Sequence, residues 1–536
     1  MTVGKQVWGR SGPGARAHAG IGALSAEPCR LLDPPTPAST DPIVGQANLR
    51  QNVPMDANSK AKTDHSRSHV VSDLHREKLG VSAIVFFVLA SVAPIGGVIG
   101  GSPVVFGAAG HAAPVTFILV GALFVTFSMG YLAMSQHVVS AGGFATYVSK
   151  GLGRRAATAI GAITLLAYTA LICGLWGFFG AITGFVSSHL LGIVIPAPVG
   201  CAGVLCLVTI LTYLGVDASL RVLCVLLLLE MSVLVPLCIA ILHQGGAAGL
   251  DLSSFRLSGL SVPGFGIALL FATTNFTGFE ATVVFSEEAK TPHRTIPIAA
   301  YIAIAIIACF YTVVTWCISV GYGAAHVQAA ALANPEAFVF NLASRYVGNW
   351  LVTTMTIFLL TSLIAMLLGF HNIASRYIFA LARAGFLPEY LGLANAATGT
   401  PQRAAICTSV IVLVIVGAFM TFGADPMTVI YPWLVSLGTV GILAMLIVTS
   451  VSVIAFFRRA PLDSRVLNTK IAPSVAAVGF LFLGYMAITN YDALLGGQGG
   501  VARWLLLLVP GAGLLGWSIA SRRIAAGLRL DYESNP

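Results

Sequence analysis

Charged residues are scarce in this chain of 536 residues: Asp, Glu, Lys and Arg together make up 9%, whereas hydrophobic residues make up 57%. Soluble domains carry roughly 25% charged residues, so the composition excludes an ordinary soluble protein and is typical of a chain that crosses a membrane many times. The net charge of +9 is therefore interpreted from the position of Lys and Arg relative to a membrane, and not as a surface for nucleic acid.

Clustered catalytic or metal-ligating side chains are also lacking. The nine cysteines form no Cys-x-x-Cys pair and no Cys/His ligand spacing, and most lie inside apolar runs, so we interpret them as small core residues. None of His111, His137, His243 and His371 has a partner at ligand spacing, and no phosphate-binding loop of the ATPase type is present. The sequence therefore argues against an enzyme, a metal site, a bound cofactor and direct drive by ATP.

Long apolar segments dominate the chain after its first part. Residues 1–78 contain no long apolar run and are rich in Pro, Ser, Ala and charge, which predicts a disordered cytoplasmic tail. A span needs roughly 20 apolar residues, which makes 79–523 the expected membrane domain and 524–536 a cytoplasmic C-terminal tail. The twelve expected spans lie near 80–106, 113–137, 156–188, 196–215, 220–243, 262–286, 297–323, 348–381, 404–423, 427–457, 470–490 and 502–522.

The basic residues predict the orientation of these spans. With the N-terminal tail in the cytoplasm, thirteen Lys and Arg residues fall in cytoplasmic loops and three, Arg256, Arg345 and Arg503, fall in outer loops. Positive charge favours the cytoplasmic side of a membrane. We therefore expect a multi-pass protein of the cell (cytoplasmic) membrane with both termini in the cytoplasm.

Two of the expected spans are interrupted at mid-depth. The first contains Ala93-Pro-Ile-Gly-Gly-Val-Ile-Gly-Gly-Ser-Pro103, and the sixth contains Asn275-Phe-Thr-Gly278. Pro and Gly weaken a helix, and interruptions at matching positions of two halves predict an inverted-repeat transporter with its substrate site at the breaks. The repeats would be 79–243 and 262–457, with two extra helices over 470–523. The alternative is that these glycines serve close helix packing.

Three stretches in order along the chain resemble the amino acid–polyamine–organocation (APC) superfamily, in its bacterial amino-acid permease branch. Two of them depart little or not at all from the family pattern, whereas Phe144 and Ala145 depart slightly in the remaining one. In chain order, the stretches are Ser140-Ala-Gly-Gly-Phe-Ala-Thr-Tyr147; Gly278-Phe-Glu280 with Glu287-Glu-Ala-Lys-Thr-Pro-His-Arg-Thr-Ile-Pro297; and Arg376-Tyr-Ile-Phe-Ala-Leu-Ala-Arg-Ala-Gly-Phe-Leu-Pro388 with Thr398-Gly-Thr-Pro401.

This resemblance implies an all-α membrane protein with twelve transmembrane helices, in a leucine-transporter-type 5+5 inverted repeat with broken helices 1 and 6. It also implies secondary transport of an amino acid or related amine. The expected partners are thus the small-molecule substrate and the lipid bilayer.

A substrate site follows from the same resemblance. The unwound first span would offer backbone N–H groups to a substrate carboxylate, as helix N-termini do for anions. The unwound sixth span would offer carbonyls and hydroxyls to the substrate ammonium. Thr274 stands where some relatives have a Trp that stacks on a cationic side chain, which weakens an assignment to arginine or polyamine exchange. The implied binding residues are Ile95, Gly96, Gly97, Thr274, Asn275, Phe276, Thr277 and Phe370, and Tyr168 is a candidate to cover the pocket.

Acidic residues and hydroxyls inside the spans are candidates for coupling and gating, because polar groups in hydrocarbon are costly. Glu230 falls where some proton-coupled relatives carry a Lys in place of a sodium ion, and it either carries a proton or is a protonated structural residue. Glu280 either links substrate occupancy to an inner gate or braces the broken helix. Thr361 and Ser362 form a candidate sodium site, against the alternative that they bond their own helix.

A charged loop follows the sixth span. Its charged residues Glu287, Glu288, Lys290 and Arg294 are expected to pair with Arg376 or Arg383 in a network that closes the cytoplasmic side, against the alternative of a solvated loop. The first hypothesis for the whole chain is proton-coupled uptake of an amino acid or amine. An exchanger of two amines, or a membrane sensor that binds amino acids without transport, is the alternative, and the long tail is the feature that favours a sensor.

Overall fold

The computed structural model describes residues 70–71, 79–138, 143–256, 262–395, 399–497, 500–528, 530 and 532. All of them belong to one compact unit, 64–536. Most of the expected N-terminal tail lies outside the described residues, as do positions 140–142 and 398 of the family-like stretches.

The described chain is helical except for two short strands, β1 (Val70–Val71) and β2 (Ala394–Asn395), which pair antiparallel, and a bridge between Leu79 and Ala289. The α-helices are α1 Val81–Val92, α2 Pro94–Gly96, α3 Ser102–Ala109, α4 Ala113–Ser135, α5 Gly143–Leu152, α6 Arg154–Leu191, α7 Ala197–Leu214, α8 Val216–His243, α9 Val262–Thr274, α10 Pro292–Tyr322, α11 Val327–Ala333, α12 Phe338–Tyr346, α13 Asn349–Arg383, α14 Gln402–Thr421, α15 Tyr431–Arg459, α16 Ala472–Thr489, α17 Tyr491–Leu494 and α18 Leu508–Ala525. Three π-helices are η1 Gly97–Gly101, η7 Pro426–Ile430 and η8 Leu467–Ile471, and the 3₁₀-helices are η2 Gly110–Ala112, η3 Ser253–Phe255, η4 Phe279–Val283, η5 Ser286–Glu288, η6 Glu389–Gly392 and η9 Val501–Leu507.

Ten helical segments of the described chain are long and apolar enough to cross a membrane. This confirms an all-helical, multi-pass protein. The segment Val81–Ser135 has 55 residues and contains two of the expected spans, while the sixth expected span is represented by a shorter apolar helix, Gly264–Thr274. At ~1.5 Å per residue, 55 helical residues exceed a hydrocarbon core of about 30 Å more than twice over. Length and composition alone therefore give ten candidate spans, and twelve stays a prediction.

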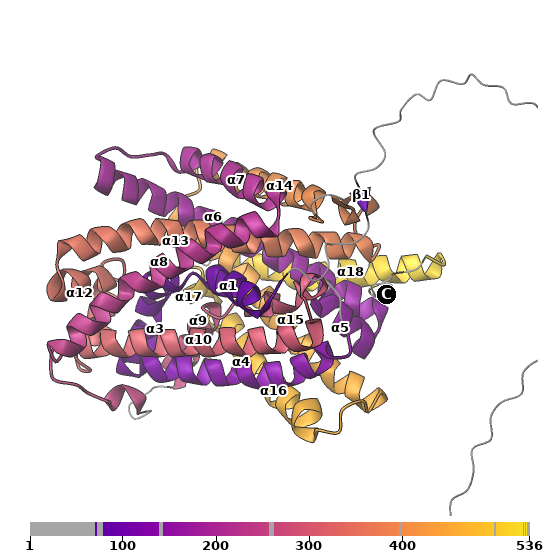
Figure 1. The fold of residues 1–536 in the computed structure, drawn as a ribbon, viewed down its shortest axis with the longest axis horizontal. Coiled ribbons are helices and arrows are strands. Elements are labelled where there is room, and N and C mark those ends of the chain that lie inside the picture. The colour runs from indigo at the N-terminus through magenta and orange to yellow at the C-terminus, as the bar shows by residue number, and fades with distance from the viewer. Residues whose placement is uncertain are drawn as a thin grey trace, which may run out of the picture. The chain divides into compact units, whose positions relative to one another are not determined.

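The long helices run side by side within this unit (Figure 1). Helix α6 packs against α13, α15 and α18, and α10 packs against α4. The short helix α1 lies inside, in contact with α8, α10 and α13. One end of the long helices carries α5, and the opposite end carries α12 (Figure 1); they are called the α5 end and the α12 end below.

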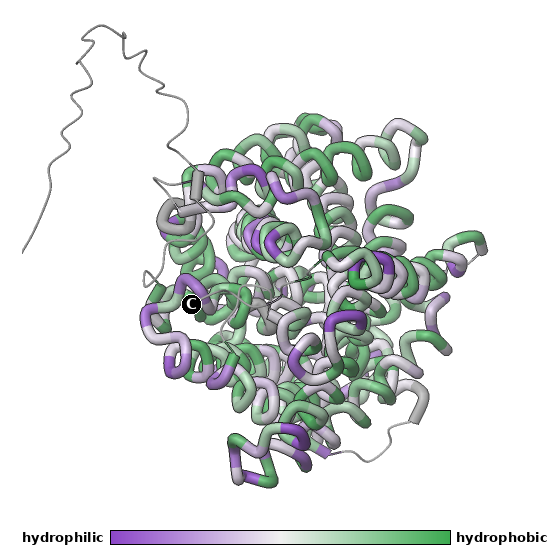
Figure 2. The backbone as a smooth tube through the Cα atoms, turned by 90° about the vertical axis from the view of Figure 1, so that its right-hand side faces the viewer, coloured by the Kyte–Doolittle hydropathy of each residue, from purple (hydrophilic) through white to green (hydrophobic). Residues whose placement is uncertain are grey.

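The outward faces of the peripheral helices are apolar. Leu228 of α8, Leu413 of α14 and Val478 of α16 are all exposed, and hydrophobic residues cover most of the helical backbone in Figure 2. Large exposed apolar side chains are unfavourable in water but match lipid tails, so the outside of these helices is suited to a bilayer.

Glycine allows a close helix contact in the interior. An added Cβ at Gly438 of α15 would overlap Leu171 and come within 2.9 Å of the Ala167 carbonyl oxygen, both on α6. The α6–α15 contact therefore uses a small residue to bring two backbones together, as membrane helices commonly do.

Candidate functional site

The first break in the chain of helices falls at Ala93. Helix α1 ends at Val92, and Ala93 has φ 48 and ψ 72, the one positive φ of a non-glycine residue in the described chain. Pro94 begins the next helix, because proline suits the first helical position but disfavours a helical conformation of the residue before it. The expected unwound residues Ile95, Gly96 and Gly97 are instead helical.

The position of the break determines which backbone N–H groups lack a hydrogen-bond acceptor within the helix. The Gly97 N–H donates to the Ala93 carbonyl at 3.0 Å. Ile95 and Gly96 lie in the first turn after the break, where backbone N–H groups have no intrahelical acceptor. A carboxylate at this point would therefore meet Ile95 and Gly96 N–H groups, and not that of Gly97.

The second break follows α9, which ends at Thr274. The Thr274 Oγ1 and Asn275 Nδ2 atoms donate to the Phe271 carbonyl at 2.7 and 3.3 Å. After a turn, Gly278 has φ 112, a conformation that favours glycine, and η4 begins at Phe279. The side chains of Thr274 and Asn275 thus bond to the end of their own helix, while Thr277 lies in the turn.

The two breaks lie against each other. An added Cβ at Gly97 would overlap both the Asn275 Oδ1 atom and the hydroxyl oxygen of Tyr311, and one at Gly101 would come within 3.1 Å of the Asn275 side chain. A Cβ at Gly278 would lie 3.2 Å from the Cβ of Ser91, on the last turn of α1. The glycines of both breaks therefore permit close approach of the other.

Three buried polar groups without a hydrogen-bond partner among the described residues surround the first break. They are the Glu230 carboxyl group of α8, the Ser362 hydroxyl of α13 and the Tyr311 hydroxyl of α10, and all three residues are 0% exposed. Ser362 is a neighbour of Glu230, and its Oγ lies 4.0 Å from where a Cβ of Gly96 would be. An unpaired buried charge is strongly unfavourable, so this cluster suits a proton, a cation or a polar ligand.

The two hydroxyls of the candidate sodium pair lie in different surroundings. Thr361 Oγ1 donates to the Phe358 carbonyl of its own helix at 3.1 Å. Ser362 alone of the two lies at Glu230 and Gly96.

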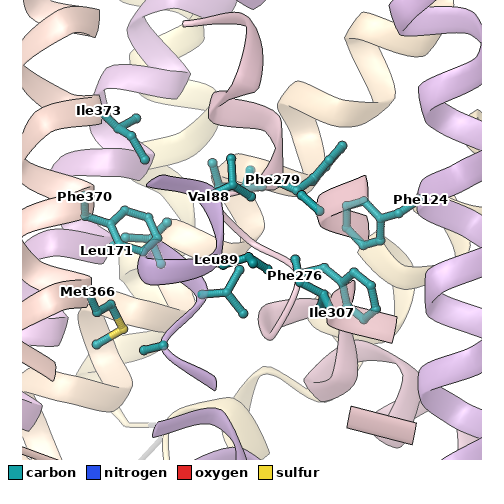
Figure 3. Close-up of a cluster of buried hydrophobic side chains, with 14 of the residues drawn as sticks. Val88, Leu89, Phe124, Leu171, Phe276, Phe279, Ile307, Met366, Phe370 and Ile373 are labelled. Atoms are coloured by element: carbon teal, nitrogen blue, oxygen red, sulfur yellow. The ribbon is translucent and has the colours of Figure 1, made fainter. Parts of the chain in front are cut away.

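Apolar and aromatic side chains enclose the breaks. Figure 3 shows Val88 and Leu89 of α1 between a group on α6 and α13, which includes Phe370, and a group around Phe276. The Phe276 ring stacks on Phe124 of α4 with centroids 5.1 Å apart. The ring centroids of Phe370 and Tyr168 are 6.4 Å apart. Those of Tyr168 and Tyr377, toward the α5 end, are 5.8 Å apart. The structure therefore brings Tyr168 and Phe370 together beside the breaks.

Two ion pairs lie between these rings and the α5 end. Arg376 donates from Nε and Nη2 to the two carboxylate oxygens of Glu288 at 2.6 and 3.2 Å, with side chains 1% and 5% exposed. Arg383 donates from Nη1 to Glu287 at 2.8 Å, and that pair is more exposed, at 21% and 12%. The expected pairing of the loop with these arginines is thus confirmed, and each of the two carboxylates has its own arginine.

The buried pair is held by further contacts. Arg376 Nη1 also donates to the Asn372 side chain at 3.1 Å, and its guanidinium lies 4.7 Å from the ring centre of Phe285. Phe285 stacks on Phe87 of α1 at 4.9 Å. The arginine thereby connects α13, the segment after the second break, and α1.

Three further residues of these helices and breaks remain to be described. The side chain of Glu280 lies outside the described residues. His371 Nε2 lies 3.2 Å from the Ala405 carbonyl, a contact that suits a structural histidine. Tyr311 was not predicted, because in an apolar run nothing distinguishes it from the other tyrosines of the sequence.

Comparison with known proteins identifies relatives. A family model described as amino acid permease matches residues 79–510. The chain is similar to cationic amino acid transporter 4, vacuolar, of Arabidopsis thaliana, with 26% identity over 303 residues, 52% of this chain and 48% of that protein. It is also similar to the methylthioribose transporter of Bacillus subtilis (strain 168), with 24% identity over 346 residues, 62% of this chain and 70% of that protein.

These matches set the level at which the chain is identified. The chain spans about half the length of the first relative. One relative comes from a plant and the other from a bacterium, so the match does not separate the bacterial branch from the rest of the superfamily.

The two ion pairs should differ in their contribution to stability. Glu288→Gln leaves the Arg376 guanidinium buried without its counter-charge, which should cost about 3–5 kcal/mol. Glu287→Gln, at the more exposed pair, should cost within about 1 kcal/mol. Thermal unfolding of the purified variants at one scan rate measures the difference. Equal midpoints for the two variants would contradict the structural importance of the buried pair.

Proposed function

Since the chain belongs to the amino acid permease family of membrane transporters, we propose that it carries an amino acid or a related amine by secondary transport coupled to protons. The family contains permeases rather than enzymes, so the site is a binding site and not a catalytic centre. The observation that carries the coupling proposal is the buried carboxyl group of Glu230, which has no hydrogen-bond partner among the described residues.

The surroundings of Glu230 favour a proton over sodium. A hard cation is normally held by several oxygen ligands. Ser362 is the candidate hydroxyl beside Glu230, whereas Thr361 donates to its own helix. One hydroxyl and one carboxyl group are few ligands for an ion, but a carboxyl group alone is sufficient to hold a proton. Sodium at Ser362 with Thr361 remains the alternative.

A zwitterionic amino acid fits the two breaks. The helix that begins at Pro94 directs the Ile95 and Gly96 N–H groups toward its start, where partial positive charge suits a carboxylate. Asn275 and the carbonyls of the second break would accept from the ammonium group. The rings of Phe276 and Phe370, on opposite sides of α1, suit an uncharged side chain. One relative is named for cationic amino acids and the other for methylthioribose.

Alternating access would then occur around the two breaks. In this proposal the chain has twelve spans in two inverted repeats of five, with the α5 end in the cytoplasm and both termini on that side. Basic residues at that end, such as Arg154, Arg383 and Arg458, support the orientation. The pairs Arg376–Glu288 and Arg383–Glu287 would close the cytoplasmic side, with Tyr168 over the pocket. Exchange of two amines around the same breaks, or sensing without transport, is the alternative.

Thermal stabilisation should identify the substrate. A ligand that binds the folded state at about 100 times its Kd stabilises it by ~2.7 kcal/mol, which raises the unfolding midpoint. We expect a response to one or a few proteinogenic amino acids with uncharged side chains, and none to putrescine or ethanolamine. A response only to amines that lack a carboxylate would contradict a carboxylate site at Ile95 and Gly96.

Substitution of Glu230 should separate coupling from binding. With one proton per substrate, a gradient of about one pH unit supplies ~1.4 kcal/mol, equivalent to a tenfold accumulation. Glu230→Gln keeps the shape of the side chain but cannot release a proton. In proteoliposomes this variant should lose accumulation driven by a pH gradient while it still exchanges substrate.

Thr361→Ala is the matched control, and its accumulation should follow the wild type. Full proton-driven accumulation by Glu230→Gln would refute the role of this carboxyl group. Accumulation that requires a sodium gradient and disappears in Ser362→Ala would favour the sodium alternative.

A further inference from the structure

The hydroxyl of Tyr311 is held in a fixed place between the two breaks. The Tyr311 ring stacks on Phe117 of α4, with centroids 5.0 Å apart and an angle of 13°. Its backbone carbonyl accepts from Thr315 Oγ1 at 2.6 Å within α10. The ring is fully buried, so its direction is set by packing. The ring presents the hydroxyl to Gly97 of the first break and Asn275 of the second.

This hydroxyl has no hydrogen-bond partner among the described residues, although it is completely buried. A buried hydroxyl without a partner is unfavourable, and Phe would fill the same space without that cost. Such a group calls for a partner outside the protein. Its position beside Gly97 places it close to the start of the helix whose Ile95 and Gly96 N–H groups lack intrahelical acceptors.

We propose that Tyr311 donates a hydrogen bond to the carboxylate of the substrate, and so selects amino acids over amines that lack a carboxylate. This inference rests on the proposed function, because it requires an amino acid at the breaks. The Tyr311 hydroxyl and the Ile95 and Gly96 N–H groups would together supply donors to one anionic group. Tyr311 would therefore be a specificity-determining residue.

The test is Tyr311→Phe, which retains the stacked ring and removes the hydroxyl alone. Two ligands are compared: the amino acid identified by thermal stabilisation, and the corresponding amine that lacks the carboxylate. Because a hydrogen bond to a charged group is lost, the affinity for the amino acid should fall roughly tenfold or more. The affinity for the amine should change little. Thr312→Val is the control, since Thr312 is the next residue of α10 and lines a different cavity with Ile118 and Val313.

The outcomes are distinct. Unchanged amino-acid affinity in Tyr311→Phe, or an equal loss for both ligands, would overturn the specificity role. A wild-type protein that binds neither ligand would overturn the proposed function, and this inference with it. A selective loss in Tyr311→Phe that Thr312→Val does not share supports the inference.

The C-terminal segment makes a second, independent set of contacts. The Tyr532 carbonyl accepts from Thr146 Oγ1 of α5 at 3.0 Å, and the Tyr532 hydroxyl donates to Thr158 Oγ1 of α6 at 2.7 Å. Leu530 and Tyr532 are both buried. Tyr532 thus connects α5 and α6 at the α5 end.

These elements lie below the substrate site. Tyr377 packs against Tyr168, which packs against Phe370. Helix α5 is itself fixed to α15, because Ser452 Oγ donates to the Tyr147 carbonyl at 2.7 Å and Arg459 donates to that of Gly151 at 2.9 Å. An opening of the α5 end that moves α5 and α6 apart would break the contacts of Tyr532.

We propose that Tyr532 acts as an intramolecular latch that restrains opening of the α5 end. The latch rests on the proposed function, since it matters only if the protein alternates between two states. Contacts made in one state and lost in the other shift the population toward the first. The wild-type chain would therefore open to this side less often than a chain without the latch.

Transport by Tyr532→Ala in proteoliposomes tests the latch. The exchange rate should rise roughly two- to tenfold, as expected when a contact specific to one state is lost. Tyr532→Phe, which loses only the Thr158 contact, should fall between this variant and the wild type. Leu528→Ala is the control, because Leu528 belongs to the same segment and is exposed.

A structural role would give a different result. If Tyr532 only stabilises the fold, Tyr532→Ala should lower the unfolding midpoint and the exchange rate together, and this would overturn the latch. An exchange rate equal to that of the wild type would overturn it as well. Exchange that is absent in the wild type and all variants would instead refute the proposed function.

Discussion

Hydrogen bonding of the backbone in a water-free interior is the constraint on which the structure depends. A helix interrupted in hydrocarbon exposes N–H and C=O groups that lipid cannot satisfy, so a break is tolerated only where protein or a cavity surrounds it. Here α1 lies inside α8, α10 and α13, and the break at Ala93 faces the second break through Gly97 and Asn275. Each break is thus enclosed by the other, and both are shielded from the bilayer by the outer helices.

The buried pair of Arg376 and Glu288 follows from the same constraint. Two charges removed from water are tolerable only if they are paired and their remaining donors and acceptors are satisfied. The Asn372 side chain and the Phe285 ring meet that requirement for Arg376. Separation of the pair would require water or other partners for both charges. This property suits a contact that must be made in one state of the protein and broken in another.

The sequence was sufficient for the class of fold and for part of the site. Scarce charge and long apolar runs predicted a multi-pass helical protein, and the charged loop of residues 287–294 was expected to pair with Arg376 or Arg383. The unwound residues of the first break were expected at Ile95 to Gly97, because glycine weakens a helix. The break lies slightly earlier in the chain, at Ala93. In the structure α1 ends at Val92, Ala93 forms the break, Pro94 begins the next helix, and Gly97 permits close approach of the second break. Tyr311 could not be predicted, because which face of α10 meets the breaks is a property of packing and not of local sequence.

The site and the ion pairs are connected by two short routes through the structure. Gly278 of the second break lies against Phe370, and the same helix α13 carries Arg376 about two turns later. The segment after Gly278 leads directly to Glu288. Both partners of the buried ion pair are therefore attached to elements that form the break. A ligand that moves the second break relative to α13 would change the distance between these partners, and we infer that this geometry is how occupancy of the site would bias closure of the α5 end.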